Sequence, residues 1–159
     1  MAVVFEGDFV VDRAREDVFA ALADADRFPP LLPTYQSHEL RDDGSADVAV
    51  KVGVGKIHGT ALVNLKPAEQ SPPESAAWSG KGRIMGGAFN LTAAFDLDAL
   101  GPTETRVRWQ GDLTIFGKLT SLAGGFIEPA ARKQIRHLID AIRNALGEGA
   151  VQAAGNESI

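Results

Sequence analysis

Histidine is the residue type in this sequence best suited to metal or acid–base chemistry, and its three copies are far apart. His38, His58 and His137 fall in two predicted strands and one predicted helix, with none of the short spacings typical of zinc ligands. The chain contains no cysteine, which excludes thiolate ligands, a cysteine nucleophile and disulfides. We therefore predict no metal site.

Carboxylates are plentiful, but their positions do not suit a catalytic pair. Asp96, Asp98, Glu104 and Asp112 lie at outward positions of predicted strands or near turns, where a solvated surface role is expected. Ser79 precedes a glycine, but it lacks the strand–turn–helix motif that exposes a nucleophilic serine. We predict no catalytic residue, and hence that the protein is not an enzyme.

The segment 80–87, with the sequence GKGRIMGG, has the composition of a phosphate-binding loop. Its spacing differs from the known nucleotide motifs, and it is followed by the alternating pattern of a strand instead of a helix N-terminus. We therefore expect no nucleotide and, more generally, no cofactor.

The composition indicates one soluble domain. The chain has 159 residues, of which 45% are hydrophobic, and this is enough for a single core. Its formal net charge is −5 and its lysines and arginines are not clustered, so nucleic acid is not an expected partner. Acidic residues interrupt the apolar N-terminus and no later segment is apolar enough to span a membrane, so we expect a cytoplasmic location. We assign residues 1–147 to the domain and 148–159 to a flexible polar tail.

Seven segments have the alternation, or the turn-bounded length, of β-strands. Most are joined by short links rich in glycine, proline and aspartate, which are too short for the crossovers that parallel strands require. An antiparallel meander is therefore predicted. The segments are 2–11, 34–41, 45–54, 57–67, 74–84, 87–99 and 103–115.

Three segments have helical patterns. Residues 13–23 predict a short helix, and residues 24–32 a second short helical segment that is stopped by prolines. Apolar residues recur at three and four over 118–146, which predicts one helix about 43 Å long. Pro129 lies inside this helix, and we expect the chain to bend at Gly124–Gly125. The fold class is therefore α+β.

One helix is too narrow to cover a flat sheet of this size. Seven strands span roughly 30 Å, whereas a helix with its side chains is about 10–12 Å across. We therefore expect the sheet to curl around the long helix, with the two short helical segments closing one end. Small residues on the expected inner face, such as Gly80, Gly82 and Gly111, should then leave room for an apolar ligand.

The residues that we predict to line this pocket are apolar and come from the closed end, the sheet and the long helix. They are Phe28, Leu31, Leu32, Val50, Ala61, Val63, Trp78, Phe89, Leu91, Trp109, Leu122 and Phe126.

The order of elements and a series of short motifs resemble one known group of proteins. The order is that of the START-like (SRPBCC) superfamily. Within it the chain is similar, over roughly residues 2–146, to the CoxG-like family, which is named after the CoxG subunit of carbon monoxide dehydrogenase. The motifs are Phe5-Glu6-Gly7, Leu32-Pro33, Val50-Lys51-Val52-Gly53, Gly80-Lys81-Gly82 and Gly117-Lys118-Leu119, the last opening a helix that continues through Phe126-Ile127.

The resemblance implies a helix-grip fold and a non-catalytic accessory protein. Such proteins are associated with molybdenum hydroxylases of the carbon monoxide dehydrogenase type, and their pocket suits a quinone, a lipid or a fatty acid. Some members carry a C-terminal extension proposed to reach the membrane. Only a short polar segment follows Leu146 here, so we expect at most peripheral membrane contact.

Two other functions are compatible with the same fold. A polyketide cyclase or aromatase would need polar groups inside the pocket, for which Arg83, Tyr35 and His58 are the candidates. A co-chaperone or assembly factor would instead bind other proteins through its surface.

Overall fold

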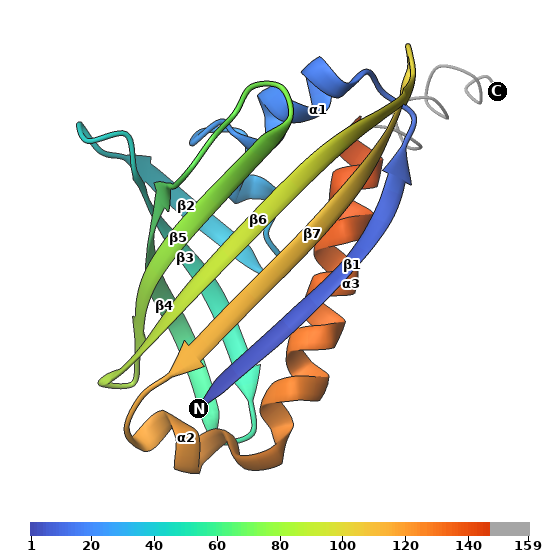
Figure 1. Cartoon of the computed structure of the whole chain (residues 1–159). Helices are drawn as coiled ribbons and strands as arrows, with labels where there is room; N and C mark the ends of the chain where they lie inside the picture. The colour runs from blue at the N-terminus through green and yellow to red at the C-terminus, as the bar shows by residue number, and fades with distance from the viewer. Residues whose placement is uncertain (147–159) are drawn as a thin grey trace, which may run out of the picture.

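In the computed structural model a seven-stranded antiparallel sheet wraps around the C-terminal helix (Figure 1). The structure describes residues 1–146; the predicted tail lies outside the described residues. The strand order is β1-β7-β6-β5-β4-β3-β2. Neighbours in sequence are therefore neighbours in the sheet, except that β1 pairs with β7. This leaves β1 and β2 as the two edges, and the C-terminal helix lies across the gap between them.

The strands confirm the predicted meander, and their ends differ from the predicted ones by at most two residues. The largest difference is at the end of β6, which continues to Gly101. Their bounds are β1 Ala2–Val11, β2 Tyr35–Leu40, β3 Ala46–Val54, β4 Ile57–Pro67, β5 Ser75–Ile84, β6 Gly87–Gly101 and β7 Glu104–Ile115.

Two short helical elements close the upper end of the sheet in Figure 1. The first is α1 (Arg15–Leu22), and the second is reduced to one 3-10 turn, η1 (Pro29–Leu31), because consecutive prolines remove the backbone donors of a longer helix. The indole Nε1 of Trp78 donates a hydrogen bond to the carbonyl of Leu22 over 2.8 Å. Its ring stacks on Phe28 with 5.3 Å between centroids, so Trp78 of β5 contacts both the end of α1 and the residue before η1.

The prediction of one continuous helix over 118–146 is wrong. The structure has α2 (Lys118–Ala123), one 3-10 turn η2 (Gly124–Phe126) and α3 (Ile127–Leu146). The chain thus changes direction at the expected glycine pair, as Figure 1 shows. Because α3 starts at Ile127, Pro129 falls in its first turn, where a missing N–H leaves no helical hydrogen bond unmade.

Both ends of α3 are fixed to the sheet side of the molecule. At the upper end, Arg143 Nε donates to the carbonyl of Val10 over 3.2 Å, and Arg13 Nε donates to the carbonyl of Leu146 over 2.8 Å. At the lower end Ile127 is buried. Within residues 1–146, no helix has the length and apolar character that a membrane crossing requires.

Candidate ligand-binding cavity

The interior contains two separate buried clusters, one at each end of the sheet. We call the first the upper core; its buried members are Phe9, Val11, Val18, Ala21, Leu22, Phe28, Ala46, Val48, Val63, Leu65, Trp78, Phe95, Leu97, Val107, Ile142 and Leu146. We call the second the lower core, formed by Ile57, Ala61, Ile84, Ile115, Leu119 and Ile127. The helix α3 begins in the lower core and ends in the upper one.

Between the two cores the interior is incompletely packed. No residue of α3 between Ile127 and Ile142 is buried, although this stretch includes the inward-facing Ile135 and Leu138. Half-buried apolar side chains in an interior keep free surface that well-packed neighbours would have covered. We call this zone the half-buried belt; it comprises Val50, Phe89, Leu91, Ala93, Trp109 and Leu113 on the sheet, and Gln134, Ile135, Leu138 and Ile139 on α3.

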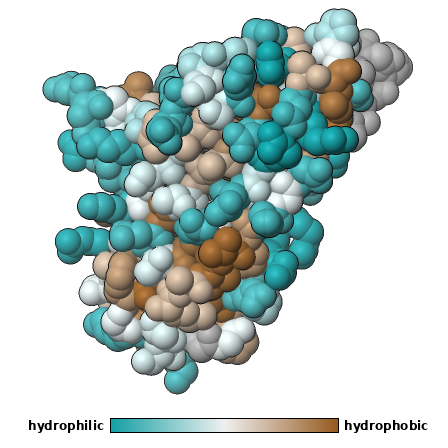
Figure 2. All heavy atoms as spheres, viewed as in Figure 1, coloured by the Kyte–Doolittle hydropathy of each residue, from teal (hydrophilic) through white to brown (hydrophobic). Residues whose placement is uncertain are grey.

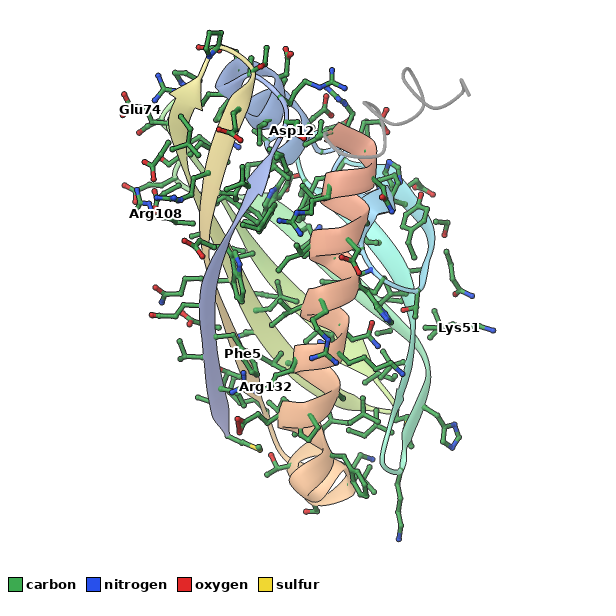
Figure 3. The ribbon with its side chains drawn as sticks, turned by 90° about the vertical axis from the view of Figure 1, so that its right-hand side faces the viewer. Phe5, Asp12, Lys51, Glu74, Arg108 and Arg132 are labelled. Atoms are coloured by element: carbon green, nitrogen blue, oxygen red, sulfur yellow. The ribbon has the colours of Figure 1, made fainter. Side chains whose placement is uncertain are left out.

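The belt reaches the surface through a groove between α3 and the edge strand β1. The groove has a volume of about 400 Å³, within the usual range for small-molecule sites. The Arg132 guanidinium lies 5.1 Å from the centroid of the Phe5 ring, and Figure 3 shows these two side chains facing each other between the two elements. The groove is lined by Val4, Phe5, Glu6, Trp109, Arg132, Ile135, Arg136 and Ile139.

The glycines of β5 do not leave the open space expected from the sequence. A Cβ atom at Gly82 would overlap the Phe89 ring, and one at Gly80 would lie 2.9 Å from Cγ of Leu91. Larger side chains of β6 therefore cover the small positions of the neighbouring strand. The free volume lies further along the interior, toward β1 and the middle of α3.

A chain of polar groups lies at the β2 edge of the interior. The Tyr35 hydroxyl is 2.6 Å from Nδ1 of His38, and Nε2 of His38 is 2.7 Å from Oδ1 of Asp26. The imidazole is mostly buried, with 13% of its side chain exposed, whereas Asp26 is 67% exposed. The chain of hydrogen bonds therefore runs from the interior to solvent.

Comparison with known proteins assigns the chain to a family. The sequence profile of CoxG, a subunit of carbon monoxide dehydrogenase, matches residues 7–147. The chain belongs to the CoxG family. No curated protein sequence matches it.

Solved structures similar to this CoxG family member share its helix-grip fold. A conserved protein from Geobacillus kaustophilus has a TM-score of 0.78 at 16% identity, with 90% of this chain and 94% of the other covered. A START superfamily protein from Mycobacterium smegmatis has a TM-score of 0.65 at 14% identity, with 90% and 96% covered. The Zhui aromatase/cyclase of a Streptomyces species has a TM-score of 0.69 at 17% identity, with 98% and 99% covered. At these identities the likeness concerns the fold alone.

The structure divides the twelve predicted pocket residues of this CoxG family member by their burial. Phe28, Ala61, Val63 and Trp78 are packed into the two cores and have almost no free surface. Phe126 lies on the surface and is 63% exposed. We therefore restrict the proposed wall to the seven half-buried residues. They are Leu31, Leu32, Val50, Phe89, Leu91, Trp109 and Leu122.

Several groups in the site were not among the predicted pocket residues. The pattern of α3 marked Ile135 and Ile139 as part of an apolar face, but periodicity does not show that the middle of the helix packs loosely. Of the three polar candidates for the interior, Arg83 and His58 are exposed, and Tyr35 is half-buried.

Charged groups with altered pKa values lie outside this cavity in the CoxG family member. Hydrogen bonding from Arg108 lowers the pKa of Asp98, and both side chains are on the outer face of the sheet. Hydrogen bonds from Ser45 lower the pKa of Asp43 in the turn before β3. Among the described residues, no group of three His, Asp or Glu side chains is placed to hold a metal ion.

Proposed function

We propose that this CoxG family member is a non-catalytic, cytoplasmic carrier that holds a quinone-like or lipid-like molecule in the half-buried belt. The observation that carries the proposal is the loose packing between two well-packed cores. In the protein without ligand, the apolar surface of this belt stays partly uncovered, and a bound ligand would cover it. Covering apolar surface contributes about 25 cal/mol per Å², which favours an apolar ligand.

We further propose that the carrier serves a molybdenum hydroxylase of the carbon monoxide dehydrogenase type. The name of the family supports this partner. The groove beside β1 gives a ligand a route between the interior and the surface without unfolding of either core.

The proposal is tested by what the protein retains on purification. Native mass spectrometry should detect one apolar molecule per chain, and solvent extraction should release it. A chain that carries no such molecule, and whose melting temperature does not rise with added quinones or fatty acids, would contradict the proposal.

A pair of substitutions on β6 tests where the ligand binds. Ala93 is half-buried on the inner face and Ala94 is exposed on the outer face of the same strand. Ala93→Leu should fill part of the belt and weaken binding several-fold, whereas Ala94→Leu should leave binding unchanged. Equal effects of the two variants would place the ligand elsewhere.

We also propose that the lower end of the molecule makes peripheral contact with an anionic lipid surface. Four large apolar side chains are exposed there: Met1, Met85, Phe116 and Phe126. The segments 51–60, 81–90 and 113–127, which form this end, contain lysine and arginine but no aspartate or glutamate, although the chain as a whole is acidic. Glu128, which directly follows the last of them, is paired with Arg132. Cations beside exposed apolar groups suit the interface of an anionic bilayer. We call this surface the basic end.

A further inference from the structure

The direction of the hydrogen bonds at the β2 edge follows from the chemistry of their three groups. An ionised carboxylate only accepts hydrogen bonds, so Nε2 of His38 donates to Asp26. In the neutral imidazole the other ring nitrogen, Nδ1, carries the lone pair and accepts from the Tyr35 hydroxyl. The phenolic oxygen keeps its own lone pairs free to accept from another group.

This arrangement requires an irregular strand. Residues three apart in a regular strand point to opposite faces, so Tyr35 and His38 would be separated. A register shift between Tyr35 and Ser37 places both on the same face. Just before it, Thr34 has a positive φ of 58°, which is unfavourable for a β-branched residue. Two local irregularities thus lie next to this hydrogen bond, and such irregularities are common at functional sites.

The carboxylate that ends this series of hydrogen bonds is also held in place. The backbone N–H of Asp26 donates to Oδ1 of Asp24 over 2.7 Å, which fixes the loop that presents its carboxylate to His38. The arrangement of a carboxylate orienting an imidazole that accepts from a hydroxyl is the one used to activate hydroxyl groups.

Tyr35 lies beside two residues of the proposed wall. Its ring packs on the upper core, its backbone N–H donates to the carbonyl of Leu32, and its partner in the sheet is Val50. Leu32 and Val50 both belong to the proposed wall. Polar contacts that fix a ligand in an apolar site are few, and a hydroxyl at this position is suited to be one of them.

Resting on the proposed function, we infer that Tyr35, His38 and Asp26 form a proton relay for a hydroxyl group of the bound ligand. The Tyr35 oxygen accepts a hydrogen bond from the ligand hydroxyl. When the ligand O–H bond breaks, its proton forms a new O–H bond on Tyr35, and the original Tyr35 proton forms an N–H bond at Nδ1 of His38. The ligand is left as an oxyanion, His38 becomes an imidazolium, and the Asp26 carboxylate stabilises that charge. No electron is transferred, and the preferred ligands are apolar molecules with a phenolic or enolic hydroxyl.

Binding of two probes of similar shape separates this inference from the proposed function. The probes are 2-naphthol and 2-methylnaphthalene, which differ in the hydroxyl, with affinities measured by calorimetry. The wild type should bind 2-naphthol about 3- to 10-fold more tightly, as expected for one net hydrogen bond. Tyr35→Phe should remove that difference and leave 2-methylnaphthalene unaffected, whereas Ser37→Ala should change neither affinity. If neither probe binds the wild type, the carrier proposal fails; if both bind equally, only the relay is overturned.

Nuclear magnetic resonance of the relay itself provides the second measurement. Tyr35 is the only tyrosine of the chain, so a tyrosine labelled at its ring carbon Cζ gives one resonance. Binding of 2-naphthol should shift this resonance and move the nitrogen signal of His38 Nδ1 toward that of a protonated nitrogen. Asp26→Asn should reduce the His38 response, whereas Glu39→Gln, which removes an exposed carboxylate of the same strand, should not. Binding of 2-naphthol with both signals unmoved would overturn the relay even if Tyr35→Phe proved too unstable to study.

Discussion

At the scale of single residues, contacts across neighbouring strands determine where the interior is full. Phe89 and Leu91 lean over Gly82 and Gly80, and Leu119 covers Gly87 in the same way. Each of these glycines allows a large side chain to lie directly against the backbone of the sheet. The small residues of β5 are therefore part of the packing.

Replacement of Gly82 tests this packing. Gly82→Ala should force the Phe89 ring out of its position and lower the free energy of unfolding by about 1–3 kcal/mol, the usual cost of overpacking. Gly53→Ala is the matched control, because a Cβ atom at Gly53 meets nothing within 4 Å. Urea denaturation of the two variants measures both effects. A Gly82→Ala variant as stable as the wild type would contradict the close contact.

Alternation along the strands predicted which side chains face inward, but not how deeply each one is buried. It marked Trp109, Phe89 and Leu91 as inward residues, because alternation along a strand specifies its faces. It did not show that Trp78 is sealed in a core and Trp109 is not, because this depends on which side chains of distant elements cover each ring. The Tyr35–His38 pair was also missed, since a register shift in β2 has no signature in alternation.

At the scale of elements, α3 is held at its ends and loose in its middle. Ile127 at its start belongs to the lower core, and Ile142 and Leu146 near its end belong to the upper core. The belt between them includes Ile135, which lines the groove. This arrangement allows the middle of the helix to form one wall of a cavity without loss of the fold.

Two isoleucines of α3 should therefore contribute unequally to stability. Ile142 has no exposed surface, so Ile142→Ala should lower the free energy of unfolding by about 2–5 kcal/mol. Ile135→Ala should cost less than about 1 kcal/mol, because the half-buried side chain leaves little new cavity, and it should alter ligand affinity instead. Equal losses of stability in thermal or urea denaturation would show that the middle of α3 packs as firmly as its end.

The elements themselves were largely predictable, and the exceptions have local causes. The short links predicted the antiparallel meander, because they are too short for the crossover connections that parallel strands require. The prediction of one continuous long helix was wrong, because the apolar periodicity continues through the glycine pair. Periodicity does not show where the helical hydrogen bonding is interrupted. Pro129 was the sequence signal of that break, and it marks the first turn of a new helix.

At the scale of the whole molecule, the two ends differ in their surfaces. In Figure 2 the apolar surface gathers in the lower half, and the upper half is mainly hydrophilic. The basic end is opposite the upper end, where α1 and the β6–β7 turn lie (Figure 1). An anionic surface would therefore attract the molecule in one orientation.

Vesicle binding tests this orientation. The protein should bind vesicles containing phosphatidylserine more strongly than vesicles of phosphatidylcholine alone. Phe126→Ser should weaken binding about tenfold or more, since burial of a phenylalanine contributes about 1.5–3 kcal/mol. Leu100→Ser is the control, because Leu100 is also exposed, at 44%, but lies at the opposite end. Binding that is equal on both lipids, or equally reduced by both variants in a sedimentation assay, would contradict the role of the basic end.

Entry of a ligand into the half-buried belt can be measured directly by fluorescence quenching. The chain has two tryptophans, of which Trp78 is sealed in the upper core and Trp109 lines the groove. Titration with a naphthoquinone that bears a short isoprenoid chain should quench the Trp109 emission saturably, with one site per chain, and Trp109→Phe should abolish this saturable component. Quenching that rises linearly without saturation, or that survives unchanged in Trp109→Phe, would show that no such ligand enters the belt.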